Sequence, residues 1–468
     1  MKHLLILILF LATPALAQDL THKAAPQSHP ILIKNAVVHP VSSPTISDGG
    51  VLFDQGVIRA ILNQGQLDEL VRSPNLPPNT LIIDADGKHV YPGLIAPYTQ
   101  LGLTEIQAVR QMQDTTEVGD ITPEASAAIA INPDSTLLPV TRSNGVLLAG
   151  VFPIGGVLPG RAAAIRLDGW TSDDMTITPG GGLILRWPSM RTISAWWMDR
   201  SESDQQQDIR RGLQRITDVF DTALAYRNAK DADPTHPTDL RWEAMRPLFP
   251  ADLTPITENA VGIDPALAPA TQLPLFILAN DIDQINAAVA FCLERGLRPV
   301  IVGGRDAPNA ADLLNRHDIP VIVNGTHVMP RRDDAPYDDP FTLPARLHEA
   351  GIRFAIANND DTAHERNTPY SVATAVKHGL PRDAALRALT IEAARILNIA
   401  DRYGSLETGK SATLILTSGD PLEVMTRVER AYIDGREIDL SNKQTTLAQK
   451  YRERYRQMGQ LKDEAEKP

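Results

Sequence analysis

The segment LPLFILANDIDQINAAVAFCLERGLRPVIVGG, residues 273–304, decides the fold class of this chain. It holds two short apolar runs that stop at Asn or Gly, which is typical of buried parallel strands. Between the runs we predict a helix, because apolar residues recur on one helical face, Asp281 can cap its start and Gly296 can end it. The residues on that face are Ile282, Ile285, Val289 and Cys292.

The same alternation continues outward from this segment. IPVIVNG (319–325) and IRFAIANN (352–359) are further buried strands of the same kind. Helices are predicted over residues 311–317, 343–350, 370–377 and 382–397. Repeated strand-helix units over residues 93–405 predict an α/β fold with a (β/α)8 TIM-type barrel, in which residues 209–249 form a helical insertion.

Both ends of the chain have a different pattern. Residues 31–92 contain short alternating runs separated by Gly, Asp and Ser, which predict a small antiparallel module. Residues 406–440 contain a second set of short strands. We therefore expect one composite β-sandwich domain, built from both ends and interrupted by the barrel. The charged tail, residues 441–468, is expected to be a polar helix or a frayed end.

Composition narrows the possible functions. With 43% hydrophobic and 22% charged residues, the 468-residue chain is an ordinary globular protein. Its net charge of -12 disfavours nucleic acid and anionic membrane surfaces as partners. The one cysteine, Cys292, cannot form an intrachain disulfide, and its place on the apolar helical face predicts a buried, inert thiol.

The N-terminus, MKHLLILILFLATPALAQ, has the pattern of a secretory signal peptide over residues 1–17, followed by a linker over residues 18–30. The apolar run from Leu4 to Leu11 is much shorter than the roughly 20 residues that span a bilayer, so a membrane anchor is the weaker alternative. We expect export across the inner membrane, a periplasmic location and no membrane span after cleavage.

Two junction segments carry a family resemblance. HVYPGLIAPYTQLGL (89–103) resembles the sheet-to-barrel junction of the amidohydrolase superfamily, usually V-x-P-G-L-I-D-x-H-x-H-x-G. AALRALTIEAARILNIADRYGSLETGKSATLILTSGDPL (384–422) resembles its return into the sheet domain. TPEASAAIAINPD (122–134) and GVLLAGVFPIGG (145–156) make the imidazolonepropionase-like periplasmic members most similar.

The resemblance implies a barrel hydrolase of non-peptide carbon–nitrogen bonds that uses one or two divalent metals. Its two first-strand histidines correspond here to Tyr98 and Gln100, which period-two geometry would direct into the barrel. The fifth- and sixth-strand histidines correspond to Leu278 and Gly303. Four ligands are thus replaced at separately anchored positions. We expect a dismantled metal centre, with no metal at the family position.

Other residues could rebuild a site at the barrel mouth. On the eighth strand, where the family has a catalytic Asp, Asn359 or Asp360 stands, and Asp360 is the one candidate catalytic residue. The expected pocket residues are Tyr98, Gln100, Glu105, Leu278, Gly303, Arg305, His327, Asn358, Asn359, Asp361 and His364. Tyr98, Gln100 and Glu105 would line the barrel floor. A relocated zinc or iron site would use His327, His364 and Asp361.

Three functions remain open on the sequence. The chain is a hydrolase with a relocated metal or none, a catalytically silent paralogue that pairs with an active amidohydrolase, or a periplasmic protein that binds a small peptide or amino-acid derivative. A family resemblance supports fold better than activity, because one scaffold carries many chemistries.

Overall fold

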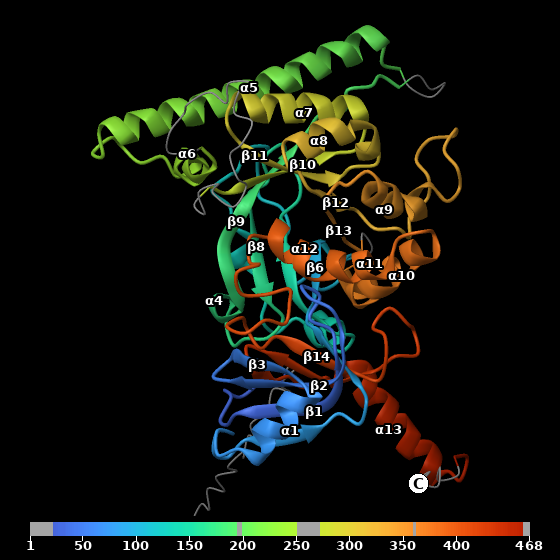
Figure 1. The fold of residues 1–468 in the computed structure, drawn as a ribbon. Helices are drawn as coiled ribbons and strands as arrows, with labels where there is room; N and C mark the ends of the chain where they lie inside the picture. The colour runs from blue at the N-terminus through green and yellow to red at the C-terminus, as the bar shows by residue number, and fades with distance from the viewer. Residues whose placement is uncertain (1–21, 194–198, 250–271, 359–361, 462–468) are drawn as a thin grey trace, which may run out of the picture.

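The computed structural model describes residues 22–193, 199–249, 272–358 and 362–461. Figure 1 shows a sheet domain built from both ends of the chain, with a barrel stacked on it and the long helix α5 (Glu202–Ala232) lying across the far end of the barrel. The predicted signal peptide lies outside the described residues, as do Asn359, Asp360 and Asp361.

The sheet domain is one eight-stranded sheet of order β16-β15-β14-β5-β1-β2-β3, with β4 paired to β1. Its strands are β1 (Ile31–Val38), β2 (Ile46–Asp54), β3 (Val57–Asn63), β4 (Leu81–Asp84), β5 (His89–Pro92), β14 (Leu414–Thr417), β15 (Val428–Ile433) and β16 (Arg436–Glu437). Ile415 of β14 pairs with Tyr91 of β5, so the two ends of the chain share the sheet.

Two features of this domain add to or differ from the sequence-based prediction. β1 runs parallel to β4 and β5, so the N-terminal module is mixed rather than antiparallel. The sheet also curls over: Phe53 of β2 packs edge-on against Tyr432 of β15, with ring centroids 5.0 Å apart, although three strands separate β2 from β15. This curvature gives the sheet a sandwich-like core of its own.

The barrel is a second eight-stranded sheet, of order β13-β12-β11-β10-β9-β8-β7-β6, with β13 lying against β6. The strands are β6 (Leu94–Thr99), β7 (Val146–Val151), β8 (Arg161–Arg166), β9 (Thr176–Arg186), β10 (Pro274–Ala279), β11 (Arg298–Gly303), β12 (Val321–Val323) and β13 (Phe354–Ile356). The predicted α/β barrel is confirmed. An ideal (β/α)8 barrel has eight parallel strands, but here β8 runs antiparallel to both β7 and β9.

Helices cover the second half of the barrel as predicted. They are α7 (Ile282–Glu294), α8 (Ala311–Arg316), α9 (Asp339–Glu349), α10 (Thr368–Lys377), α11 (Arg382–Leu389) and α12 (Ile391–Ile396). α7 ends at Gly296, whose φ is +62°, and it buries Cys292. Burial raises the pKa of that thiol well above its usual range, so it stays protonated and inert. The helix predicted over residues 382–397 is broken at Thr390, between α11 and α12.

The remaining helices are short or peripheral. They are α1 (Gln64–Arg72), α2 (Ala127–Ala130), α3 (Leu137–Arg142), α4 (Ser172–Met175) and α6 (Leu240–Met245), with 3-10 turns η1 (Arg110–Met112), η2 (Arg246–Leu248), η4 (Ala307–Ala310) and η5 (Thr362–Asn367). α5 and α6 form the predicted helical insertion. α13 (Lys443–Gln457) is the polar tail helix, and none of its side chains is buried. No helix in the described ranges is both long and apolar enough to cross a membrane.

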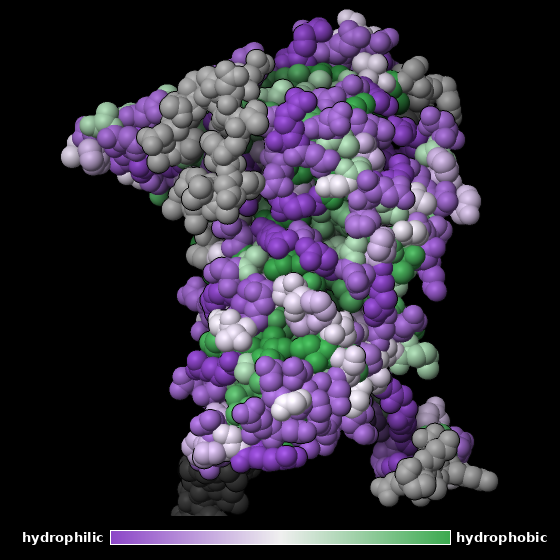
Figure 2. Space-filling view, viewed as in Figure 1, coloured by the Kyte–Doolittle hydropathy of each residue, from purple (hydrophilic) through white to green (hydrophobic). Residues whose placement is uncertain are grey.

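Two apolar clusters divide the barrel. The inner cluster joins residues from all eight strands, such as Ile95, Phe276 and Val302, and side chains from α12 and the segment after it. The outer cluster packs the opposite strand faces against the surrounding helices and continues into the sheet domain. In Figure 2 the surface is largely hydrophilic, and hydrophobic atoms gather where barrel and sheet domain meet. The barrel interior is therefore a packed core.

A pair of histidines in the sheet domain predicts a pH-dependent stability. His39 Nε2 lies 2.9 Å from His89 Nδ1, and its ring stacks on Tyr91. Burial, helped by His89, lowers the pKa of His39 from 6.5 to about 4. Between these two pKa values, the unfolded chain binds a proton at His39 more readily than the folded protein does. The stabilisation of the folded protein that is present above pH 6.5 is therefore lost as the pH falls toward 4.

We expect urea midpoints to drop between pH 7 and pH 5, and to drop less in His39→Phe, which keeps the stacking but cannot titrate. Exposed His348 on α9 provides the control, as His348→Gln should leave the pH slope of the wild-type protein unchanged. An equal pH slope in His39→Phe and the wild type would rule out His39 as the source.

Candidate functional site

At the first and fifth strands, the barrel holds apolar and aromatic side chains where the resemblance implies metal ligands. Tyr98 of β6 and Leu278 of β10 both pack against the inner cluster. The ring of Tyr98 lies 4.6 Å from that of Phe152, which in turn meets Phe276 edge-on at 4.9 Å. These rings form an aromatic layer, defined here as Tyr98, Phe152 and Phe276, which packs with the inner cluster of the barrel.

Tyr98 is placed inside the barrel by a bulge in β6. The pairing of β6 with β7 shifts register between Ala96 and Thr99, so Ala96 belongs to the outer cluster while Tyr98 joins the inner one. Burial raises the pKa of Tyr98 to about 12, although the positive charge of Arg186 on β9 opposes the shift. The phenol is therefore neutral at physiological pH.

Glu105 does not line the barrel floor, contrary to the sequence-based expectation. Its carboxylate accepts a hydrogen bond of 3.1 Å from Asn132 Nδ2, in the loop before α3. The strand alternation ends at Thr99, because the chain turns sharply at Gly102, whose φ is +84°. Gln100 lies in this turn, where its carbonyl accepts from the Leu103 N–H, so period-two geometry no longer governs its direction.

Gly303 also departs from the expected geometry. It pairs in register with Ala279, which belongs to the outer cluster, whereas its neighbour Val302 joins the inner one. Its φ of +102° lies in a region that favours glycine, and a Cβ built here would stand 2.4 Å from Asn280 Oδ1. The positive φ disfavours a histidine here, and any side chain at this position would require the Asn280 amide to move.

This packing predicts a stability difference between two glycines. Gly303→Ala should lower the free energy of unfolding by about 1–3 kcal/mol more than Gly409→Ala, since overpacking adds to the backbone strain. Gly409 has a similar φ of +93°, but no atom of the described residues lies within 4 Å of the point that an added Cβ would occupy. The comparison of the two variants therefore isolates the cost of the close contact at Gly303. Equal losses in denaturant unfolding would contradict the close contact with Asn280.

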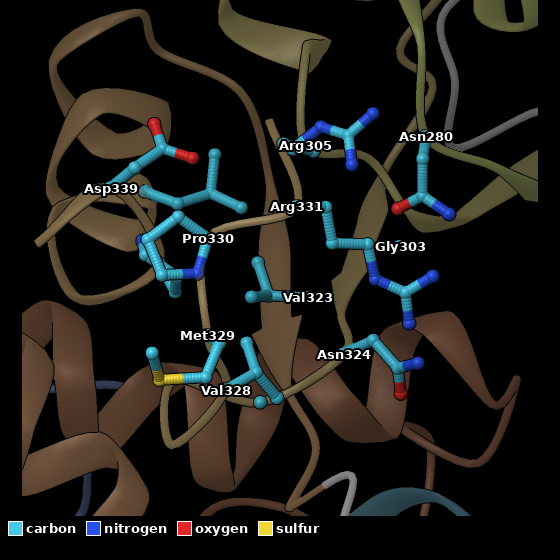
Figure 3. A pocket seen from close by; sticks show the side chains of 13 residues that line it. Asn280, Gly303, Arg305, Val323, Asn324, Val328, Met329, Pro330, Arg331 and Asp339 are labelled. Carbon is cyan, nitrogen blue, oxygen red and sulfur yellow. The ribbon is translucent and has the colours of Figure 1, made fainter. Parts of the chain in front are cut away.

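A pocket opens beside the carboxyl ends of β10, β11 and β12 (Figure 3). Its volume is about 80 Å³, and its polar lining comes from Asn280, Arg305, Asn324, Arg331 and Asp339. In Figure 3 the Arg331 guanidinium is drawn between the amides of Asn280 and Asn324. Of these residues, only Arg305 was among the candidates from the sequence.

The residues of the suggested relocated site are placed as follows. His327 is exposed, and its Nε2 lies 2.7 Å from Thr374 Oγ1 on α10. Asn358 is buried after β13 and donates through Nδ2 to the His364 carbonyl at 3.0 Å, which holds the η5 segment. Within the described ranges, no group of three or more His, Cys, Asp or Glu side chains could hold a metal ion.

Comparisons with known proteins agree with this fold. Residues 300–439 match the model of the amidohydrolase family. Amidohydrolase tasK of Hapsidospora irregularis is 21% identical over 454 residues, which cover 87% of this chain and 43% of that protein. Imidazolonepropionase of Mesorhizobium japonicum is 28% identical over 152 residues, covering 32% of this chain and 36% of that enzyme. The matched regions thus cover less than half the length of either relative.

A solved structure extends the likeness to the whole fold. An amidohydrolase from Thermotoga maritima superposes with a TM-score of 0.71 at 23% identity, over 87% of this chain and 99% of that one. At this identity the likeness shows the fold alone. Together, the findings show that residues 300–439 match the amidohydrolase-family model and that the chain shares its fold with a solved amidohydrolase, which supports the resemblance that the junction segments indicated.

Proposed function

We propose that this chain, with its amidohydrolase-family domain and its resemblance to amidohydrolase-type hydrolases, is a hydrolytically silent member that binds a small ligand at the barrel mouth. One observation carries the proposal: Tyr98, Leu278 and Gly303, on three different strands, stand where the family resemblance implies metal ligands. A half-buried neutral phenol, an aliphatic side chain and a glycine stand in place of the donors that a metal needs.

These residues do not fit a divalent metal. Zinc sites take three or four donors from His, Cys or carboxylates, and catalytic ones keep a further position for water. A hydrolase of this family would rely on such a metal to activate that water. Because aromatic rings lie inside the barrel where the family resemblance implies a metal, this centre does not support metal-assisted hydrolysis.

The mouth is nevertheless suited to recognition. Arg186 ends β9 and is exposed. Asn280, Arg305 and Asn324 follow β10, β11 and β12, respectively. Guanidinium and amide groups bind and orient polar ligands, and neither of them acts as a general base at neutral pH. We therefore place ligand binding ahead of hydrolysis, with the predicted signal peptide directing the protein to the periplasm.

A second candidate function is that of a silent subunit paired with an active amidohydrolase. The observation that favours it is α13, which projects from the sheet domain in Figure 1. Leu447, Tyr451 and Tyr455 of α13 and the following Met458 are 41–52% exposed and recur at helical spacing. An exposed apolar stripe of this kind marks an interaction surface. Co-purification with a ligand-complete paralogue would support this function.

Elemental analysis of the mature protein, after incubation with zinc and dialysis, tests the proposal. We expect well below one metal per chain, and no hydrolysis of amide or imide substrates. Tyr98→His with Gln100→His should stay inactive, because the fifth- and sixth-strand donors are still missing. One tightly bound metal per chain that is lost in His364→Ala would contradict the proposal and establish the relocated site.

A further inference from the structure

The tail helix α13 stands apart from the packed body of the protein. It begins soon after Leu440, which still packs against the outer cluster, and Figure 1 shows it projecting from the sheet domain. A capping box at Asn442 fixes its start, yet none of its side chains is buried. An isolated helix of about 15 residues is only marginally stable in water. A surface that covers one face of α13 would therefore stabilise it.

One face of α13 is apolar. The apolar stripe, defined here as Leu447, Tyr451, Tyr455 and Met458, spans about 80° of the helix circumference. All four side chains are 41–52% exposed. A tyrosine has an apolar ring and a polar hydroxyl, which suits the boundary between water and an apolar phase. The stripe therefore fits a surface that is polar at its boundary and apolar beneath.

Basic side chains lie on both sides of this stripe when successive residues are placed about 100° apart around the helix. This basic border is defined here as Lys443, Lys450, Arg452 and Arg454. Within the described ranges, no ion pair engages any of the four. The one acidic residue of α13, Glu453, lies on the opposite face and pairs with Arg456 at 2.6 Å. The stripe is thus bordered by cations that no carboxylate neutralises.

Charge is distributed unevenly between α13 and the rest of the chain. α13 holds five Lys or Arg residues and one Glu, a net charge of +4, whereas the whole chain has -12, which leaves -16 for the remainder. Repulsion between that remainder and an anionic surface is screened over about 10 Å at 0.1 M salt. A helix of 15 residues is about 22 Å long, so the far half of α13 lies beyond this range from the sheet domain.

We propose that α13 binds the surface of an anionic phospholipid bilayer, with the apolar stripe among the headgroups and the basic border on the lipid phosphates. Apolar burial and attraction to anionic headgroups add in such a contact. Pairing of α13 with a second α13 is disfavoured, because two helices of charge +4 repel each other. A protein groove would need carboxylates on both sides of its apolar floor. The inference goes beyond the proposed ligand binding and does not depend on it.

Co-sedimentation of the mature protein with vesicles tests the inference. Vesicles of phosphatidylcholine with about one-third phosphatidylglycerol are compared with vesicles of phosphatidylcholine alone, at about 50 mM salt. We expect binding to the anionic vesicles to be at least about 100-fold tighter, because each cation near such a surface contributes about 5-fold. Salt of about 500 mM should remove most of this preference. Equal binding to both vesicles, or no binding to the anionic ones at low salt, would overturn the inference.

Two double variants connect the binding to α13. Lys450→Gln with Arg454→Gln should weaken binding to anionic vesicles about 25-fold. Tyr451→Ser with Tyr455→Ser should weaken it at least about 10-fold, because the stripe loses apolar area. Since α13 buries no side chain, both variants should keep the urea midpoint of the wild type. Folded variants that bind these vesicles as tightly as the wild type would contradict the proposed role of α13.

A charge-matched control and two alternative partners complete the test. Arg59→Gln with Arg427→Gln makes the same charge change at exposed positions of the sheet domain and should bind vesicles as the wild type does. A dimer, or a ligand-complete amidohydrolase, that replaces vesicle binding and is lost in Tyr451→Ser with Tyr455→Ser would assign the stripe to a protein and overturn the inference. These outcomes leave the metal analysis unaffected, so the proposed function is tested separately.

Discussion

Asp168→Ala is expected to lower the free energy of unfolding by about 3–5 kcal/mol, the largest loss we expect from one side chain, because it leaves buried charge unpaired. Asp168 follows β8, and its side chain is fully buried. Its two oxygens lie 2.9 Å from Arg142 Nη1 and 2.9 Å from Arg436 Nη1. Arg142 is itself 2% exposed.

The contact also connects the two domains. Arg142 belongs to α3 of the barrel, whereas Arg436 belongs to β16 of the sheet domain. Burial lowers the pKa of Arg142 while Asp168 opposes the shift, yet a guanidinium stays charged at neutral pH. Without Asp168, two cations would face each other at the domain boundary, so we expect the barrel and the sheet domain to be destabilised together.

Urea denaturation followed by circular dichroism measures this loss. Asp120→Ala is the matched control, because Asp120 pairs with Arg215 at 2.7 Å but is 57% exposed. Exposed pairs contribute about 0–1 kcal/mol, so this control should shift the midpoint only slightly. A loss in Asp168→Ala no larger than that of the control would show that the buried pair does not hold the domains together.

Phe276→Ala is expected to lower the free energy of unfolding by about 3–5 kcal/mol, as large-to-small substitutions of buried aromatic residues do. Phe276 is fully buried in the aromatic layer, between Phe152 and the glycine turn at Gly182. The residues around it belong to separate strands and cannot close over the lost ring. Phe276→Leu, which leaves a smaller cavity, should be less damaging.

Phe341 provides the control for this prediction. It lies on α9, partly exposed beside His378, so Phe341→Ala should destabilise the protein much less. Thermal and urea unfolding of the three variants measure the difference. If Phe276→Ala were tolerated as well as Phe341→Ala, the barrel would contain open space rather than a packed aromatic layer, and the case against a metal centre would weaken.

Much of the fold could be predicted from local patterns. α7 and its flanking strands follow from apolar periodicity, with the helix ending at Gly296. The reversed direction of β8 could not be predicted, because a short buried run such as RAAAIR (161–166) is equally compatible with parallel and antiparallel pairing. Strand direction there depends on the connections to β7 and β9, which only the tertiary structure shows.

The candidate site was predicted less completely, for reasons visible in particular residues. Period-two geometry does not extend to Gln100, because β6 ends at Thr99. Gly303 was matched through the family resemblance, which could not show that its positive φ redirects the chain. Asn280 and Asn324 stand directly after apolar runs, and that position was the available signal for both. Arg331 gave no such signal, because its place in the pocket depends on the path of the loop 325–331.

Anomalous diffraction at the zinc edge, from crystals of the mature protein grown with excess zinc, tests the silent centre most directly. Zinc bonds to protein donors at about 2.0–2.3 Å, so a bound ion would be located unambiguously. We predict no peak within bonding distance of Tyr98, Leu278 or the strand end that leads to Asp360. A fully occupied peak at the barrel mouth, bonded to three or more protein side chains, would contradict the account.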